Sequence, residues 1–494
     1  LMPAAGSAPA AVNAAFLPTN PFPPDEASDG YERGVSISQE WDAATTEAAL
    51  SAAAYVLANL RELAGLSGGD PRGGDDPQRE EKLRAFCRRF VERAFRGPLN
   101  EEQEAFYIAK QFAEAETKED AVARVVLLTL KSPRFLYLEI GSEEVPQSYA
   151  LAERLSFSLC DTLPDEPLRA AAAAGKLTDA AELRAQAERL AASPLGRAKL
   201  RDFLLNLFMV DHLAEMGKDP EQFPEFTPEL ISDMRYSLER LIEETAASPE
   251  ADFRRLLLTE EVQLNGPLAA FYGAELPADA PFQPVKLDGG ARAGVLTHPY
   301  LTAGFAYTST SSPIHRGVFL ARNLLGRTLR PPPEAVSPLT PDLHPDLTTR
   351  ERVALQTSDA NCAKCHSMIN PLGFSLEHFD AVGRYRKEEK GRPIDAAGSY
   401  LDREGQLRTF HGARELAQFL AESEESRTAV AERLFQNLVK QPIQAWGPDE
   451  LPQLAARFAE TNYNLRALMV ESAILAANPP EQATAGSETA AAGE

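Results

Sequence analysis

The feature that most constrains this chain is the pentapeptide Cys362-Ala363-Lys364-Cys365-His366. A Cys-x-x-Cys-His run is the attachment signature of c-type haem. On one helical turn, two thiols three positions apart can each add to a vinyl group of the porphyrin. The histidine that follows is then carried under the iron as its proximal ligand. The motif therefore predicts a helix that holds one covalent haem c through Cys362 and Cys365, with His366 as the iron ligand.

Two other interpretations of the motif stay open. A bare Cys-x-x-Cys pair would suit a redox dithiol or half of a zinc site equally well. A zinc site needs further Cys or His ligands nearby, and the remaining cysteines, Cys87 and Cys160, lie far upstream. The other interpretation is a chance match. It is disfavoured because the chain has only four cysteines and seven histidines, and three of these residues share one pentapeptide.

Length and charge exclude some classes of partner. At 494 residues the chain exceeds a single hydrophobic core, so several domains are expected. Lys and Arg number 50 against 73 Asp and Glu, and the net charge of −23 repels nucleic acid and anionic membranes. The longest apolar stretch, Val125 to Leu130, is too short to span a bilayer. We expect a redox partner protein, possible membership of a larger redox complex, no nucleic acid and no membrane span.

The expected location follows from the motif. Haem is attached to c-type cytochromes outside the cytoplasmic membrane, so we expect a periplasmic or extracellular protein. The chain begins at Leu1 with no charged segment followed by an apolar one, so an export signal cannot be read from it directly. In an oxidising compartment Cys87 and Cys160 could form a disulfide. Both lie in apolar helical patterns, which favour two buried thiols instead.

The pattern along the chain predicts a mainly α protein of several segments. Helical periodicity occupies 41–63, 79–140, 148–247 and 413–477. Asn100 and Gln103 form a capping-box-like helix start, and Thr227 is an N-cap followed by a proline. After Thr227, one helix face is expected to be buried through Leu230, Met234, Leu238, Leu241 and Ile242.

The remaining secondary structure is expected around the motif. Short strands or extended loops are predicted at 282–287 and 294–297, and Ser312-Pro313 begins a helix that runs to about residue 325. A helix is expected downstream of the motif at 373–379. Turn residues between β-like runs predict a short β-hairpin near 393–412.

These patterns divide the chain into seven predicted parts. They are a Pro/Ala-rich arm with a first helix (1–75), a helical domain (79–142), a larger mainly helical domain (146–330), a Pro-rich connector (331–350), a haem-c-binding segment (351–412), a C-terminal helical domain (413–478) and a disordered tail (479–494).

Several stretches carry a family pattern. The most specific are SSPIHRGVFLARNLLGRTLRPPP at 311–333 and CAKCHSMINPLGFSLEHFDAVGRYR at 362–386; the others are FPPDEASDGY at 22–31, RAFRGPLNEEQ at 93–103, SPRFLY at 132–137, LAERLSFSL at 151–159, LPDEPL at 163–168 and GVLTHPYL at 294–301. On these stretches the chain resembles the secreted cytochrome-like proteins first described in planctomycetes. In these proteins, several uncharacterised conserved segments flank one haem-binding segment. The resemblance implies a predominantly helical, exported haem-c protein and supplies no substrate. The sequence departs from the pattern at Cys160, where many relatives have tryptophan.

The sixth iron ligand decides the function, and the sequence leaves it open among His298, His315, His378 and Met469. A second strong ligand fills the sixth coordination position of the iron and suits electron transfer. An open sixth position admits peroxide, O₂ or other small ligands. His298 and His315 lie in the family stretches, where helix capping is the alternative role. For His378 the favoured interpretation is a surface helix residue, and for Met469 it is a core methionine. Met368 follows His366 too closely to reach the opposite haem face easily.

Side chains around the motif suit haem packing and charge. The apolar residues that could pack against the porphyrin and keep water away from it are Ile369, Pro371, Leu372, Phe374, Leu376 and Phe379. Three guanidinium groups could pair with the haem propionates, since arginine favours bidentate carboxylate contacts: Arg316, Arg384 and Arg386.

The leading hypothesis is an exported mono-haem c-type cytochrome-like protein that transfers electrons. A haem-dependent oxidoreductase, peroxidase- or oxygenase-like, is the alternative, because the long helical portion ahead of the motif exceeds what electron transfer needs. A third possibility is a binding or scaffold protein in which haem acts as a folding staple. No catalytic residue is predicted.

Overall fold

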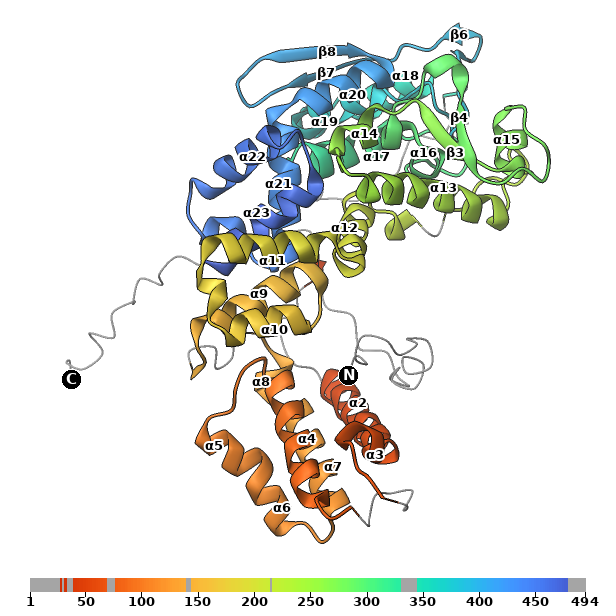
Figure 1. Ribbon diagram of the computed structural model, residues 1–494. Coiled ribbons are helices and arrows are strands. Elements are labelled where there is room, and N and C mark those ends of the chain that lie inside the picture. Colours follow the sequence, from red (N-terminus) through yellow and green to blue (C-terminus); the bar gives the residue numbers. More distant parts are fainter. Residues whose placement is uncertain are drawn as a thin grey trace, which may run out of the picture. The chain divides into compact units, whose positions relative to one another are not determined.

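The computed structural model describes residues 27–28, 31–32, 39–68, 76–138, 144–213, 216–329 and 344–478. Within them the chain is mainly helical, with a few short two-stranded antiparallel sheets, which confirms the predicted fold class (Figure 1). The chain divides into two compact units, Leu1–Ala187 and Glu188–Glu494, and the division falls inside the domain predicted at 146–330. The predicted N-terminal arm, most of the Pro-rich connector and the C-terminal tail lie outside the described residues.

The N-terminal unit is helical, and the helices from α2 to α7 share one apolar core. Its main elements are α2 (Gln39–Ala58), α3 (Leu60–Ala64), α4 (Arg79–Ala94), α5 (Glu101–Glu104), α6 (Lys110–Glu114), α7 (Lys118–Leu130), α8 (Pro133–Leu136), α9 (Gln147–Cys160) and α10 (Glu166–Ala173). Val56, Leu83 and Val125 are fully buried where α2, α4 and α7 pack together. The predicted capping box is confirmed: Asn100 Oδ1 accepts from the Gln103 amide at 2.9 Å, and Gln103 Oε1 accepts from the Asn100 amide at 3.2 Å.

The two upstream cysteines belong to this helical unit. Cys87 and Cys160 are both buried, and neither forms a disulfide, as the apolar patterns around them favoured. Burial raises the pKa of the Cys87 thiol to about 12, because the apolar surroundings disfavour the thiolate. Cys87 is therefore a core packing residue.

The C-terminal unit contains the motif. After α11 (Ala180–Ala192), which spans the division, its main elements are α12 (Pro194–Leu207), α13 (Pro228–Ala247), α14 (Phe253–Leu258), β3 (Glu261–Leu264), α15 (Gly266–Tyr272), β4 (Gln283–Lys286), α16 (Pro299–Gly304), α17 (Pro313–Phe319), η8 (Leu320–Leu324), α18 (Thr349–Gln356), α19 (Ala360–Phe374), β7 (Ala397–Leu401), β8 (Leu407–His411), α20 (Gly412–Glu422), α21 (Glu424–Val439), α22 (Glu450–Glu460) and α23 (Leu465–Ala477).

Several local predictions for this unit are confirmed. Thr227 caps α13, accepting from the Leu230 amide at 3.3 Å, and the predicted apolar face of this helix is buried. Ser312 caps α17, which continues as the π-helical turn η8. Strands β7 and β8 form the hairpin expected near 393–412, in antiparallel register from Ala397 opposite His411 to Leu401 opposite Leu407.

Two predictions for this unit are wrong in part. Gly294–Thr297 forms a 3-10 turn rather than a strand, while β4 pairs with β3, which the sequence pattern did not reveal. The helix expected at 373–379 is instead the end of α19, which stops at Phe374. In the turn that follows, the Phe379 amide donates to the Leu376 carbonyl at 3.1 Å, and Arg316 Nη1 donates to the Leu376 and Phe379 carbonyls at 2.9 and 2.7 Å.

Helices α17 and α19 meet backbone to backbone. A Cβ atom added to Gly317 would lie 2.0 Å from the Ile369 carbonyl oxygen, and one added to Gly373 would lie 1.9 Å from the Pro313 carbonyl oxygen. The start of α17, at Pro313, meets the end of α19, whereas Gly317, later in α17, meets Ile369, earlier in α19. The two helices therefore cross antiparallel. Only residues without a side chain allow this approach. The second half of α19 is thereby locked into the unit.

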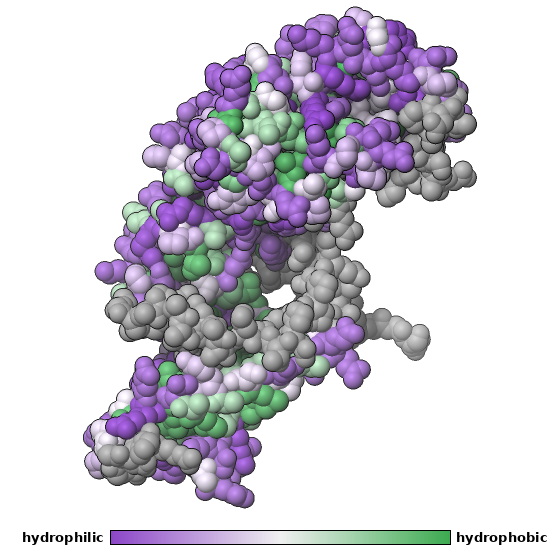
Figure 2. Space-filling view, turned by 90° about the vertical axis from the view of Figure 1, so that its right-hand side faces the viewer, coloured by the Kyte–Doolittle hydropathy of each residue, from purple (hydrophilic) through white to green (hydrophobic). Residues whose placement is uncertain are grey.

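The surface of the described residues is largely hydrophilic. On the face shown in Figure 2, hydrophilic side chains dominate the described part of the chain, and hydrophobic ones form patches between them. Among the described residues, no helix combines the length and apolar character needed to cross a bilayer.

Candidate functional site

The Cys-x-x-Cys-His motif occupies the first two turns of α19. Asp359 caps the helix, with its Oδ1 accepting from the Asn361 amide at 2.8 Å. Cys362 is partly exposed, Cys365 is exposed, and the two are not joined by a disulfide. The predicted placement of both thiols on one helical turn is confirmed, and both are accessible for covalent attachment.

His366 follows on the same turn and is partly exposed. Its Nδ1 lies 2.9 Å from Asn370 Oδ1, one helical turn further along α19. An amide oxygen only accepts hydrogen bonds, so Nδ1 of the neutral imidazole carries the proton and Nε2 keeps its lone pair. Two accessible thiols and an imidazole with a free Nε2 lone pair form the donor set that a c-type haem uses, so the residues present fit this group. Within the described ranges, no three His, Cys, Asp or Glu side chains gather closely enough to hold a bare metal ion.

The second half of α19 and the turn that follows it differ from the motif half, because they are buried. Phe374, Leu376 and Phe379 have only 6, 2 and 1% of their surface exposed. The guanidinium of Arg350 lies 4.3 Å from the Phe374 ring, and Tyr385 packs edge-on against Phe379 at 5.7 Å. The structure gives these apolar side chains core positions. Their contact with a porphyrin stays a prediction, as it does for Ile369, Pro371 and Leu372.

Arg316, on α17, is almost completely buried and holds the turn after α19. Its guanidinium donates to the backbone carbonyls of Thr302, Leu376, Phe379 and Asp380 at 2.7 to 2.9 Å. Burial lowers the pKa of Arg316 to about 10, against the opposing effect of nearby carboxylates. Because these donors already serve the protein backbone, the contacts do not support the propionate role predicted for Arg316.

The other two candidate arginines also have protein partners. Arg384 pairs with Glu225 at 2.9 Å, and its guanidinium lies 4.0 Å above the Phe271 ring. Arg386 lies 3.3 Å from the buried carboxylate of Glu377. Burial raises the pKa of Glu377, while Arg316 and Arg386 act in the opposite direction. A propionate contact for Arg384 or Arg386 remains a prediction.

His298, one of the four candidate sixth ligands, is a buried structural residue. The Ser237 hydroxyl donates to the Gln263 carbonyl at 2.5 Å, so Ser237 Oγ accepts from His298 Nε2, 3.1 Å away. His298 Nδ1 accepts from the Tyr300 amide at 3.3 Å and caps α16. Both ring nitrogens are therefore occupied, and the capping alternative describes this histidine.

The other three candidates occupy different surroundings. His315 is exposed in the first turn of α17 and contacts the Tyr307 ring at 5.2 Å. His378 Nδ1 bonds the Arg386 carbonyl at 2.9 Å, and its ring stacks on Tyr385. Met469 is completely buried in α23, as expected for a core methionine. The identity of the sixth ligand stays a prediction.

His298 predicts a specific pH dependence of stability. Burial, aided by the charge of Arg292, lowers the pKa of His298 from 6.5 to about 3. Between these values the unfolded chain binds a proton that the folded chain does not, so stability falls as the pH drops below 6.5. We expect a loss of about 2 kcal/mol between pH 7 and pH 5 from this residue. Urea unfolding at both values should show the loss in the wild type and a shallower dependence in His298→Gln. Equal slopes in the two proteins would refute the assignment.

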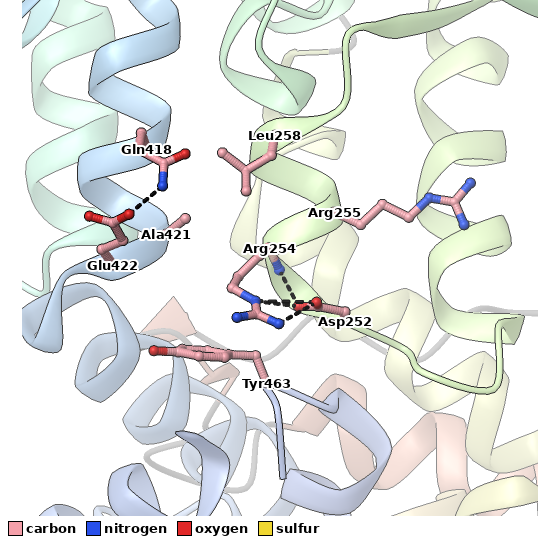
Figure 3. Close-up of a pocket in the computed structure, with 8 residues that line it drawn as sticks. All are labelled: Asp252, Arg254, Arg255, Leu258, Gln418, Ala421, Glu422 and Tyr463. Carbon is pink, nitrogen blue, oxygen red and sulfur yellow. Dashed lines mark hydrogen bonds and ion pairs between the residues drawn. The ribbon is translucent and has the colours of Figure 1, made fainter. Parts of the chain in front are cut away.

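A surface pocket of about 520 Å³ lies between α14, α20 and the turn before α23 (Figure 3). Its lining residues are Asp252, Arg254, Arg255, Leu258, Gln418, Ala421, Glu422 and Tyr463. Asp252 pairs with the Arg254 guanidinium at 2.7 Å, and this group lies 4.5 Å from the Tyr463 ring. None of the site residues predicted from the sequence lines this pocket. It is therefore separate from the motif.

Asn370 is the site residue that the sequence analysis missed. The available signal was an amide side chain four positions after the motif histidine, on the same helical face. Its partner Thr357 lies before α19, and only the packing of α18 against α19 brings it to the site.

Comparison with known proteins yields two matches, both to family models without an assigned function. Residues 292–389, which include the motif, match PSCyt3, a protein of unknown function (DUF1588). Residues 147–274 match PSD4, a protein of unknown function (DUF1592). No curated protein and no solved structure matches the chain. The names of the two models agree with a resemblance to cytochrome-like proteins.

Proposed function

We propose that this chain is an exported c-type cytochrome-like protein that holds one haem covalently and transfers electrons. Cys362 and Cys365 would form the two thioether links, and His366 would supply the axial nitrogen through Nε2. The observation that carries the proposal is the presentation of all three groups on one accessible helical turn, with the His366 Nδ1 already bonded to Asn370. The name of the family model that matches residues 292–389 adds support.

The surroundings of the motif suit an electron carrier. When bound, haem supplies a one-electron couple between ferric and ferrous iron. The buried half of α19, locked against α17 at Gly317 and Gly373, gives the three attachment residues a rigid base. The exposed motif half leaves an approach for a redox partner protein. A net charge of −23 favours a partner with a basic docking surface.

Covalent attachment is tested on the full chain, exported in a bacterial host that attaches haem c. The denatured protein is expected to retain its visible haem absorption and to carry the mass of one haem. Cys362→Ala with Cys365→Ala should abolish both signals, whereas Cys87→Ala, a change at a buried thiol away from the motif, should leave them intact. Wild-type protein whose haem is removed by denaturation would overturn the proposal.

Added cyanide separates the carrier from a haem enzyme. A low-spin spectrum that cyanide leaves unchanged supports electron transfer, because both axial positions are then filled. Rapid binding of cyanide or peroxide would overturn the carrier assignment and support the oxidoreductase alternative.

A further inference from the structure

Three side chains connect α18 to the motif through a directed chain of hydrogen bonds. It begins at Thr357, the C-cap of α18, whose hydroxyl donates to the Val353 carbonyl at 2.8 Å. A hydroxyl has one proton, so Thr357 Oγ1 is left as an acceptor. Asn370 Nδ2 lies 2.8 Å away and donates to it. This bond determines which end of the Asn370 amide faces α18.

The orientation of Asn370 in turn determines the protonation of His366. With Nδ2 directed at Thr357, the amide presents Oδ1 to His366 Nδ1, 2.9 Å away. The oxygen has no proton to donate, so the neutral imidazole places its single proton on Nδ1. The Nε2 lone pair is then available to a metal.

The part of this chain of hydrogen bonds that joins Thr357 to Asn370 is protected from water. Thr357 and Asn370 have only 8 and 6% of their surface exposed. Both neighbours of Asn370 are constrained as well, because Ile369 is buried against α17 and Pro371 has a fixed backbone φ. Bonds in such surroundings hold their geometry against competition from solvent.

We infer that Asn370, oriented by Thr357, is a positioning residue that fixes the tautomer and ring direction of His366 for iron ligation. The inference rests on the proposed haem function and deepens it. A hydrogen bond accepted from the remote nitrogen of a ligating histidine raises the basicity of the ligand. Asn370 therefore lowers the reduction potential of the centre, because a more basic ligand favours the ferric state.

The first test needs no haem. Full-length protein with Cys362→Ala and Cys365→Ala is labelled with ¹⁵N-histidine, and the His366 signals are assigned by their loss in His366→Gln. Nitrogen chemical shifts should report a protonated Nδ1 and an unprotonated Nε2. Asn370→Leu and Thr357→Val should move the proton toward Nε2, and Thr357→Ser, which keeps the hydroxyl, should restore the starting tautomer. A tautomer unchanged by Asn370→Leu would overturn the inference.

The second test uses the haem-loaded protein and potentiometric titration. Asn370→Leu should raise the reduction potential, and Asn370→Asp, a stronger acceptor, should lower it. A tenfold change in relative affinity for the two oxidation states corresponds to about 59 mV. Asn361→Asp is the matched control, because it adds the same charge at an exposed position of α19 and should shift the potential less. Equal shifts at positions 361 and 370 would overturn the inference. Wild-type protein without covalent haem would refute the proposed function alone, because the tautomer measurement is made on protein that holds no haem.

Discussion

Replacing Gly373 by alanine is expected to lower the free energy of unfolding of the C-terminal unit by about 3 kcal/mol. The added Cβ would lie 1.9 Å from the Pro313 carbonyl oxygen and 2.6 Å from the carbonyl carbon. These are backbone atoms of α17, so no side-chain rotation relieves the overlap and the two helices must separate. Separation of the helices would also open the contact at Gly317, where an added Cβ would lie 2.0 Å from the Ile369 carbonyl oxygen.

Urea unfolding in a Trp41→Phe background isolates the relevant unit. The chain has two tryptophans, so Trp446 is the only tryptophan left in this background. It packs against Phe435 in the C-terminal unit, with ring centroids 5.1 Å apart, and its fluorescence therefore reports on that unit. Gly217→Ala is the matched control, because a Cβ there meets nothing within 4 Å. The control should be neutral or slightly stabilising. A Gly373→Ala midpoint equal to that of Gly217→Ala would show that α17 and α19 are not in backbone contact.

Replacing Arg316 by methionine should have a comparable or larger effect, a loss of about 4 kcal/mol. Methionine retains much of the apolar stem but removes the donors to four backbone carbonyls. The Leu376 and Asp380 carbonyls would keep a backbone amide donor, whereas those of Thr302 and Phe379 would lose the guanidinium hydrogen bond. It also removes the guanidinium located 3.8 Å from the Glu377 carboxylate, which is itself almost completely buried. The turn after α19 would then lose the contacts that hold it.

The same Trp446 fluorescence measures this loss, with Arg322→Met as the control. Arg322 is exposed on η8 and donates to one carbonyl, that of Leu329, so its replacement should change the free energy of unfolding by less than about 0.5 kcal/mol. Arg316→Met in combination with Glu377→Gln should be less destabilising than the single change, because the single change leaves the buried carboxylate with only one of its two arginine neighbours, Arg386. Additive effects of the two replacements would refute a coupled pair.

The features predicted correctly from the sequence are those determined by near neighbours. The capping box at Asn100, the N-cap at Thr227 and the spacing of the motif on one turn all depend on residues within four positions of one another. The β7–β8 hairpin is similarly local, since its turn residues join adjacent strands.

The features missed or mistaken depend on distant residues. The helix expected at 373–379 is instead the end of α19 followed by a turn, and the Leu376 carbonyl in that turn also accepts from Arg316, 60 positions away. Arg316 also has four backbone partners that the sequence pattern did not reveal, and its propionate role stays a prediction. At the site, the position of Asn370 four residues after His366 could have indicated their contact. The contact of Thr357 with Asn370 depends on the packing of α18 against α19, which the spacing does not reveal. Sequence patterns indicate which groups are present, whereas tertiary contacts decide what each group bonds.

The contrast between the two halves of α19 has a consequence for how amide protons exchange with solvent. Amides in the second half, from Ile369 to Phe374, can open only when α17 departs, so they should exchange at the rate of global unfolding of the unit. Amides around Cys362 lie in an exposed first turn and should exchange through local fraying. A protection gradient within a single helix would therefore leave the thiols reachable by an attachment enzyme while the core beside them stays folded.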